Sequence, residues 1–182
     1  MYLIGITGGS ASGKSTLAIQ LQTRLSQRKV KIFHMDAYFK EESHRPDITG
    51  PWNRKTYRDD NHPDSIDWDR FHKDFDAACA EDWDVIIIEG LFAFWDEAVY
   101  SKLNLKLYVD CNDDERFARR IKRNLGYGQD FEEITDRYVH AVQPRHREYV
   151  EPGKWKADLI VNGFETSPLT IEIIVSWIEK FI

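Results

Sequence analysis

The sequence predicts an α/β fold of three layers, in which a parallel sheet of about five strands has helices on both faces. Short apolar runs alternate along the chain with stretches of helical periodicity. The run at residues 84–90 is apolar on both faces, which is typical of a central parallel strand. Because parallel neighbours need a crossover connection, this alternation indicates a parallel sheet rather than a set of hairpins.

Five short apolar runs are the expected strands. In parallel sheets, ligands bind beyond the carboxyl ends of the strands, and Gly8, Asp36, Glu89 and Asp110 fall at or just after these ends. The expected strands cover residues 2–7, 31–36, 84–90, 105–110 and 157–161.

Five segments with helical features follow the strands. Leu17, Leu21 and Leu25 recur at helical spacing in the first of them. Three acidic residues open the segment 112–124, where the helix dipole favours negative charge. Pro144 is expected to kink or end the helix in which it lies. The expected helices cover residues 14–28, 67–81, 112–124, 131–148 and 168–181.

Residues 40–66 fit no regular element. They are polar and rich in proline and charge. A connection of this length inside a compact domain is usually functional or mobile. We expect it to form one side of a ligand-binding site.

Composition limits the classes of protein to consider. The chain has 182 residues, of which 42% are hydrophobic, and this suits one folded domain over residues 1–182. Its formal net charge of −6 argues against a general nucleic-acid binder, which needs a basic surface. We therefore expect no nucleic acid among its partners.

The cysteines and the hydropathy pattern favour a cytoplasmic protein. Cys79 and Cys111 are far apart, and neither has another Cys or His at metal-ligand spacing, so we expect two free thiols. Residues 1–9 lack the basic and apolar segments of a signal peptide. No stretch approaches the ~18 apolar residues of a membrane helix, so we expect no membrane association.

A glycine-rich turn after the first expected strand has the pattern of a phosphate-binding loop. Residues 8–15, GGSASGKS, fit G-x-x-x-x-G-K-[ST] between a strand and a helix, the context that this motif requires. Backbone N–H groups of such a loop surround a polyphosphate, and the next helix directs its positive end at the anion. The motif narrows the fold to the P-loop NTPase class. The expected nucleotide-binding residues are Gly8, Gly9, Ser10, Ala11, Ser12, Gly13, Lys14, Ser15 and Thr16.

Lys14 and acidic residues at strand ends complete the expected site. Lys14 would contact the β and γ phosphates, and the Ser15 hydroxyl would ligate Mg²⁺. Glu89 ends an apolar strand where a second metal-binding carboxylate is expected. Asp36 and Asp110 end neighbouring strands, and three carboxylates at one sheet edge indicate a shared site.

The remaining polar residues favour a small-molecule kinase over other nucleotide-binding classes. A GTPase switch would carry an N-K-x-D type guanine reader, which this sequence lacks, and a motor ATPase normally needs more chain. A kinase needs a base for the acceptor hydroxyl, and Asp36 is the expected base. Tyr38 and Phe39 follow it as expected walls of the acceptor pocket.

Four arginines supply the cations that phosphoryl transfer requires. They recur at three- and four-residue spacing in RFARRIKR, so they form one basic stripe along the expected helix. We expect Arg119 and Arg123 to neutralise the developing charge. The stripe consists of Arg116, Arg119, Arg120 and Arg123.

Several motifs together resemble the uridine kinase / phosphoribulokinase group of P-loop kinases. GGSASGKSTLA, MDAYFK, NHPDSID, VIIIEGLF, LYVDCNDDERFARRIKRN and VQPRHREYVEPGKWKADLIV follow in the order and spacing of that group. The resemblance covers nearly the whole chain. It implies transfer of the γ-phosphate of ATP, with Mg²⁺, to a hydroxyl of a small metabolite, often the 5′-hydroxyl of a nucleoside.

The resemblance also assigns roles to residues. It implies that Asp36 is the catalytic base and that Tyr38 lies in the acceptor site. It implies a lid, here short and covering about residues 119–130, whose arginines close over the phosphates and help to hold the ribose. Arg119 therefore counts among the expected acceptor-binding residues as well.

Three departures from that group leave the acceptor open. The hairpin that reads the base is missing before the strand at 84–90, and RNLGYGQD replaces the R-G-R of the lid. The D-H-P motif appears here as Asn61-His62-Pro63. We expect Asp60 or Asp59 to replace the missing carboxylate, and Asn61 and His62 to contact the acceptor.

Several alternatives stay open at this point. Trp52, Tyr57 and His62 are candidates to contact an acceptor ring, although Trp52 and Tyr57 would equally pin the long loop to the body of the protein. Tyr127 either stacks on adenine or forms a surface turn. Nicotinamide riboside, pantothenate and sugars are the alternative acceptors. A non-catalytic nucleotide-binding regulatory protein is the alternative from another class, and a homodimer is one option for the oligomeric state.

Overall fold

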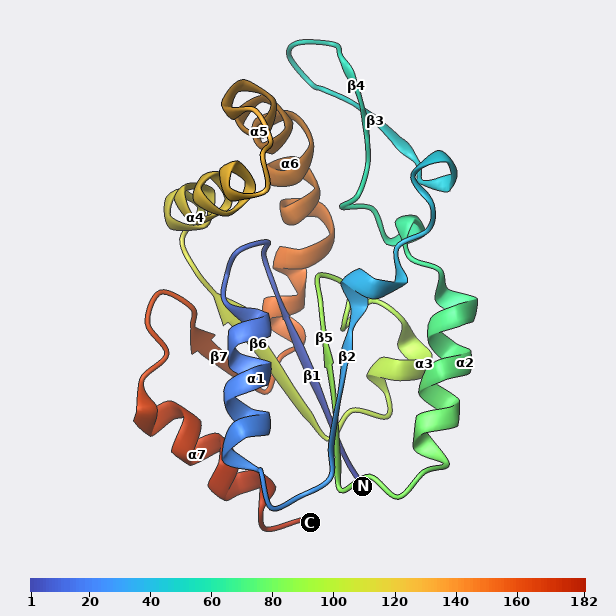
Figure 1. The fold of residues 1–182 in the computed structure, drawn as a ribbon, viewed down its shortest axis with the longest axis vertical. Helices are drawn as coiled ribbons and strands as arrows, with labels where there is room; N and C mark the ends of the chain where they lie inside the picture. Colours follow the sequence, from blue (N-terminus) through green and yellow to red (C-terminus); the bar gives the residue numbers. More distant parts are fainter.

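The computed structural model describes residues 1–182 and is built around a five-stranded sheet (Figure 1). The strand order is β2-β5-β1-β6-β7, and every neighbouring pair is parallel. All five expected strands are confirmed, with ends within two residues of the expected ones. The strands are β1 (Tyr2–Gly8), β2 (Val30–His34), β5 (Val85–Glu89), β6 (Leu105–Asp110) and β7 (Leu159–Asn162).

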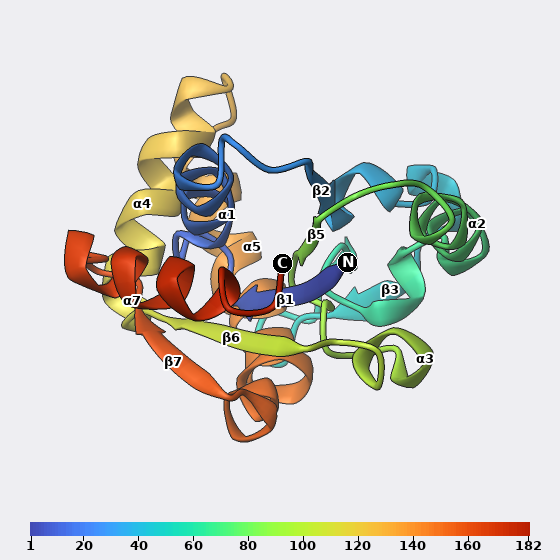
Figure 2. The ribbon, with the colours of Figure 1, turned by 90° about the horizontal axis from the view of Figure 1, so that it is seen from below.

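Helices cover both faces of the sheet and form the outer two layers. α1 (Lys14–Arg24) and α7 (Pro168–Ile178) pack on one face (Figure 2). α2 (Trp68–Cys79) and α3 (Glu97–Tyr100) pack on the other. Every residue of the inner strands β1 and β5 is buried between these layers, which explains why their sequences are apolar on both faces. None of the helices combines the length and the apolar character that a membrane span requires.

A long helical run follows α4 (Asp113–Gly126) and passes through Pro144. Proline has no N–H to donate, and wide π-helical turns on either side carry the chain past it. The helix expected over residues 131–148 therefore does not end at Pro144 but continues into a 3₁₀ segment. The segments are α5 (Phe131–Arg137), a π turn (Tyr138–Val142), α6 (Gln143–Arg145), a π turn (His146–Val150) and a 3₁₀ segment (Glu151–Lys156).

Residues 40–66 contain a small antiparallel hairpin, so the expectation of no regular element there was wrong. Its strands are β3 (Asp47–Thr49) and β4 (Thr56–Arg58). Strands of three residues are too short to show the alternation by which a strand is recognised in sequence.

Aromatic residues of the hairpin pin it to the helical run. The Tyr57 hydroxyl donates a hydrogen bond to Asp136 at 2.5 Å, and its ring stacks on His140 with centroids 6.2 Å apart. The Trp52 ring meets the same imidazole edge-on. Trp52 and Tyr57 therefore pin the loop to the body of the protein.

The two cysteines are free thiols, as the sequence predicted. Cys79 ends α2, and Cys111 follows β6. Burial raises the pKa of both thiols, so both are protonated near neutral pH.

Phe71 offers a test of the core beneath α2. Its side chain is fully buried, and its ring stacks on Phe75 with centroids 5.9 Å apart. Replacing Phe71 with Ala should lower the free energy of unfolding by about 3–5 kcal/mol, because it leaves a cavity among packed rings. Urea denaturation measures the loss. Trp155→Ala is the control, since Trp155 is 86% exposed, and it should change stability by less than about 0.5 kcal/mol. Equal losses in the two variants would contradict this description of the core.

Candidate active site

A cleft with a volume of about 620 Å³ lies where the carboxyl ends of β1, β2 and β5 meet α4. This is the edge at which parallel sheets bind ligands. The cleft brings together most of the residues that the sequence predicted for nucleotide, metal and proton transfer. Its lining residues are Ser10, Ala11, Gly13, Lys14, Ser15, Thr16, Asp36, Phe39, Asp60, Asn61, Glu89, Leu91, Arg119, Arg120, Arg123 and Tyr127.

The phosphate loop turns sharply because its backbone takes unusual conformations. Gly8 and Gly13 have φ values of 148° and 104°, which favour glycine. A Cβ on Gly8 would also collide with the carbonyl oxygen of Val109 on β6. Ala11 has a φ of 64°, in the left-handed region that few residues other than glycine adopt. These conformations curl the loop so that its residues line the cleft.

Two buried cations meet at Gly9. The Lys14 ammonium donates to the Gly9 carbonyl oxygen at 3.0 Å, and burial lowers the pKa of Lys14. The guanidinium of Arg116 lies against the Cα of Gly9, where a Cβ would collide with its Nη1. Arg116 is 1% exposed and donates through Nε to the Cys111 carbonyl. Its spacing in the sequence placed Arg116 on the basic stripe but gave no sign of this role.

Three buried donors around the phosphate loop have no hydrogen-bond partner in the protein. They are the Ser12 hydroxyl, Nη1 of Arg116 and Nε of Arg120. A buried donor without a partner costs free energy, and donors on cations bind anionic oxygens strongly. Ser12 and Arg116 lie outside the lining of the cleft, whereas Arg120 belongs to it. Together with Lys14 and Arg123, Arg120 gives the cleft a cationic lining that fits a polyphosphate such as that of ATP.

α4 presents two arginines to the phosphate loop. Arg120 donates to the Ser10 hydroxyl oxygen at 3.0 Å, and Arg123 lies 3.5 Å from the same oxygen. Burial, helped by the nearby positive charge of Arg123, lowers the pKa of Arg120 to about 10, which leaves it cationic at neutral pH. The sequence pattern placed all four arginines on one stripe and favoured Arg119 and Arg123 over Arg120.

Arg119 lies in the wall of the cleft, but its guanidinium is bonded elsewhere. It donates to Glu115 at 2.6 Å and to the carbonyl oxygens of Gly163 and Phe164 at 2.8 and 2.9 Å. These bonds hold the connection between β7 and α7 against α4. Arg120 is therefore better placed than Arg119 to meet a phosphate in this arrangement.

Glu89 and Ser15 meet at the base of the cleft. The Ser15 hydroxyl donates to Oε1 of Glu89 at 3.0 Å, and Nδ1 of His34 lies 2.7 Å from the same oxygen. No sequence motif pointed to His34 as a site residue. No group of three or more His, Cys, Asp or Glu side chains is arranged to hold a metal. Mg²⁺ typically takes one or two protein ligands together with phosphate oxygens, so Ser15 and Glu89 fit Mg²⁺ bound with a nucleotide.

Asp36 presents a free carboxylate to the cleft. It lies in the 3₁₀ turn Met35–Tyr38, directly after β2. It is exposed, and no hydrogen bond or ion pair involves it. Phe39 lines the same wall. A carboxylate in this state can accept a proton from a hydroxyl bound beside it.

Tyr38 does not reach the cleft. Its side chain is 9% exposed, its ring meets Phe71 edge-on, and its hydroxyl donates to Asp74 at 3.1 Å. Burial raises its pKa to about 12. The 3₁₀ turn directs neighbouring side chains to different sides, so Asp36 lines the cleft while Tyr38 packs in the core. The structure thus separates two residues that the sequence analysis had placed together.

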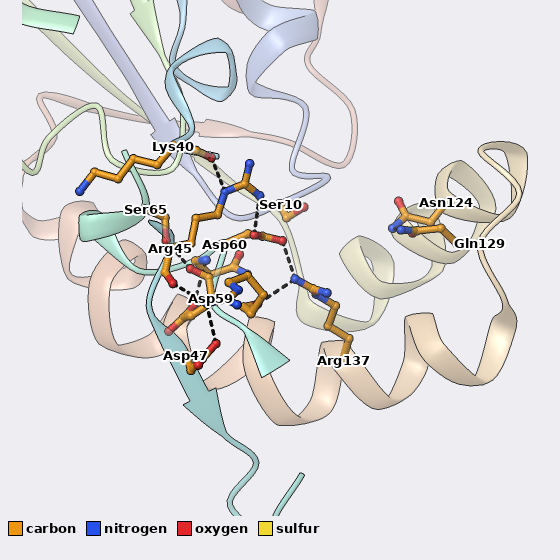
Figure 3. A network of polar contacts seen from close by, with 12 residues as sticks. Ser10, Lys40, Arg45, Asp47, Asp59, Asp60, Ser65, Asn124, Gln129 and Arg137 are labelled. Atoms are coloured by element: carbon orange, nitrogen blue, oxygen red, sulfur yellow. Dashed lines mark hydrogen bonds and ion pairs between the residues drawn. The ribbon is translucent and has the colours of Figure 1, made fainter. Parts of the chain in front are cut away.

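Asp60 lines the cleft between two arginines (Figure 3). Arg45 donates to one carboxylate oxygen at 2.8 Å, and Arg137 donates to the other at 2.6 Å. Asn61, which is 7% exposed, lines the cleft beside it, and no hydrogen bond involves its side-chain amide. Asp60 is thus neutralised by the protein, whereas the amide of Asn61 is free to bind a ligand.

Asp59 and His62 flank this pair but do not line the cleft. Asp59 is fully buried and accepts a hydrogen bond from Arg145 at 2.6 Å. The His62 ring packs edge-on against Tyr149, and its Nδ1 accepts from the backbone N–H of Asp64. Both residues shape the loop that carries Asp60 and Asn61.

Asp110 is also directed away from the cleft. Its carboxylate forms an ion pair with Lys154 at 2.7 Å. The shared site that was expected from three strand-end carboxylates therefore contains Asp36 and Glu89 but not Asp110.

His146 is a buried neutral histidine close to the cations beneath the loop. Burial lowers its pKa to about 4, and the positive charges of Arg116 and Lys14 act in the same direction. Its Nδ1 is buried without a partner. A proton on this imidazole would add a third positive charge to the same region.

Comparison with known proteins agrees with this geometry. The profile of the phosphoribulokinase / uridine kinase family matches residues 54–169. The chain belongs to this family. Members of the family are kinases, so the chain is an ATP-dependent small-molecule kinase.

Relatives named uridine kinase match this kinase over nearly its whole length. Those of Chloroflexus aggregans and Clostridium novyi are each 31% identical to it, covering 97% and 99% of this chain and 94% and 96% of their own. That of Latilactobacillus sakei is 29% identical and covers 99% of this chain and 94% of its own.

Solved structures share the fold of the kinase at lower identity. A Silicibacter protein proposed to be a fructose transport system kinase superposes with a TM-score of 0.67 at 19% identity, covering 88% of this chain and 89% of its own. A Bacillus stearothermophilus protein described as a possible uridine kinase gives 0.58 at 21% identity, covering 87% of each chain.

Gly9 allows the packing at the phosphate loop to be tested. Gly9→Ala should weaken ATP binding by about tenfold or more, because the new methyl group must displace the buried Arg116 guanidinium. Isothermal titration with Mg-ATP measures the change. Gly126→Ala is the control, since a Cβ there meets nothing within 4 Å, and its affinity should match the wild type. Unchanged ATP affinity in Gly9→Ala would show that the packing of Arg116 against Gly9 does not determine the conformation of the phosphate loop.

His146 predicts a pH dependence of stability. Because its pKa is about 6.5 in the unfolded chain and about 4 when folded, the unfolded chain takes up the proton first as the pH falls. The free energy of unfolding should therefore fall between pH 6.5 and 4, by up to about 1.4 kcal/mol per pH unit from this residue. Urea denaturation across this range measures the slope. A slope that is identical in His146→Gln would contradict the prediction.

Proposed function

We propose that this kinase transfers the γ-phosphate of ATP to a sugar hydroxyl of a nucleoside. The observation that carries the proposal is the position of Asp36. Its unpaired carboxylate lines the same cleft as Lys14, Ser15 and Glu89. A free base beside a phosphate-binding loop is what hydroxyl phosphorylation requires.

Phosphate binding, metal binding and proton transfer are each assigned to different residues of the protein. When bound, ATP supplies the phosphoryl group and Mg²⁺ offsets its charge. Lys14 and the loop N–H groups would hold the phosphates, and Arg120 and Arg123, which contact Ser10 of the loop, would offset their charge from α4. Ser15 and Glu89 would hold Mg²⁺. Asp36 accepts the proton of the acceptor hydroxyl.

The acceptor side of the cleft suits a small molecule with both an apolar face and hydroxyl groups. Phe39 and Leu91 provide apolar contact there, and the free Asn61 amide offers a donor and an acceptor. A ribose with its attached ring has this combination. The relatives named uridine kinase support a nucleoside as the acceptor.

The base-reading part of the acceptor site is reduced in this chain. α2 ends at Cys79 and β5 begins at Val85, which leaves no room for a hairpin between them. The alignment with the Chloroflexus aggregans relative spans 201 residues, more than the 182 of this chain, so that relative has residues that are absent here. We infer that the sugar, more than the base, determines which acceptor binds. The alternative acceptors are nicotinamide riboside, sugars and, as a hydroxyl compound without a sugar, pantothenate.

A panel of acceptors tests the proposal. ADP release from Mg-ATP would be measured with uridine, cytidine, other nucleosides, nicotinamide riboside, pantothenate and free sugars. Release that requires a nucleoside supports the proposal. Release only with pantothenate or a free sugar would show that this compound, and not a nucleoside, is the acceptor. ATP binding without any acceptor-dependent release would favour a regulatory role.

Asp36→Asn should separate chemistry from binding. Loss of the base should lower kcat by about 10²- to 10⁴-fold, whereas the Kd for Mg-ATP should stay within a few-fold of the wild type. Asp110→Asn is the matched control, because it is also an aspartate at a strand end but lies outside the cleft. Loss of its surface ion pair should change kcat by less than about fivefold. Near-normal turnover by Asp36→Asn would remove Asp36 from the role of base.

A further inference from the structure

β2 and β5 pair along their whole length and bring two polar residues together at the cleft end of the sheet (Figure 1). Ile32 pairs with Ile87, and both pack in the apolar cluster that contains the buried leucines of α1. Side chains alternate between the two faces of a strand, so the next pair on this face is His34 and Glu89. An apolar row beneath α1 therefore ends in a histidine and a glutamate.

Two donors of the protein share one oxygen of the Glu89 carboxylate. Nδ1 of His34 lies 2.7 Å from Oε1, and the Ser15 hydroxyl donates to the same oxygen at 3.0 Å. A carboxylate only accepts hydrogen bonds, so the hydrogen between His34 and Glu89 is on Nδ1. No other hydrogen bond involves the Glu89 side chain, and its Oε2 therefore has no partner in the protein.

This arrangement fixes the carboxylate while leaving it able to bind a cation. The Glu89 side chain is 6% exposed, and two hydrogen bonds to Oε1 hold it in one orientation. Ser15 gives only its hydrogen to Glu89, so its oxygen also stays able to bind a cation. The His34 ring is about half exposed and does not line the cleft, so it can act on a ligand there only through Glu89. Groups that orient a metal ligand in this way typically contribute about 10- to 100-fold to metal affinity.

We propose that His34 is a positioning residue for magnesium: it orients the Glu89 carboxylate so that Oε2 stays available to the Mg²⁺ that accompanies ATP. The inference rests on the proposed binding of Mg²⁺ by Ser15 and Glu89, and it is independent of which acceptor is phosphorylated. A purely structural role for His34 would be to tie the end of the edge strand β2 to β5. Such a role would affect the stability of the protein but not the contribution of Mg²⁺ to ATP binding.

Isothermal titration with ATP, first in excess Mg²⁺ and then in EDTA, separates these roles, because only the first titration includes the cation. In His34→Ala, the ATP affinity in Mg²⁺ should fall by about tenfold or more, whereas the affinity in EDTA should match the wild type. His34→Leu keeps the volume of the side chain but removes the donor, so it should behave in the same way. His34→Asn should recover most of the loss, since its amide nitrogen is as many bonds from Cα as Nδ1 is and can donate to Oε1. His44→Ala is the control, because His44 is an exposed histidine outside the cleft, and it should match the wild type in both titrations.

Glu89→Gln, measured in the same two titrations, separates this inference from the proposed function. It should lose affinity in Mg²⁺ at least as strongly as His34→Ala does. An unchanged affinity in Glu89→Gln would overturn both the proposed role of Glu89 and the role of His34. A loss in Glu89→Gln without one in His34→Ala and His34→Leu would overturn the role of His34 alone. Equal losses in Mg²⁺ and in EDTA, or no recovery in His34→Asn, would show that His34 is structural and would also overturn it.

Discussion

The close approach of two buried cations to Gly9 is the constraint on which the active site depends. Lys14 bonds the Gly9 carbonyl, and the Arg116 guanidinium occupies the space that a side chain at residue 9 would need. Like charges in a buried region repel, and partnerless donors nearby add to the cost. His146 stays neutral in the same region. The site therefore carries an excess of positive charge, and the cations that line the cleft, Lys14, Arg120 and Arg123, suit an anionic ligand such as a polyphosphate.

The long helical run holds the acceptor side of the cleft in place. Its Arg137 fixes Asp60, its Arg145 fixes Asp59, and its Asp136 accepts the Tyr57 hydroxyl of the hairpin. Residues 40–66 thus behave as a packed wall rather than as a free loop. The wall leaves the Asn61 amide unpaired at the cleft, which the unpaired Asp36 carboxylate also lines. This division between locked and free groups supports recognition of hydroxyls.

Sequence could predict what depends on local pattern, but not what depends on distant partners. All five strands followed from short apolar runs. The reason is clearest for the inner strands β1 and β5, which are buried on both faces and are therefore apolar on both. Helical spacing showed that four arginines share a side of α4. It could not show that Arg119 donates hydrogen bonds to the carbonyl oxygens of residues 163 and 164, about forty residues later in the chain. Nor could it show that Arg120 instead contacts the phosphate loop. The prediction that Tyr38 lines the acceptor pocket was wrong for the same reason, because the residues that it contacts in the core lie on α2.

In the proposed reaction, the phosphoryl group passes to an acceptor hydroxyl and not to water. Incubation with ATP labelled in the γ-phosphate, followed by separation of products, measures this directly. We predict that the label appears in a nucleoside monophosphate, in amounts equal to the ADP formed, and that little inorganic phosphate forms. Label that appears only as inorganic phosphate, with every acceptor supplied, would contradict the account and identify a hydrolase built on the same fold.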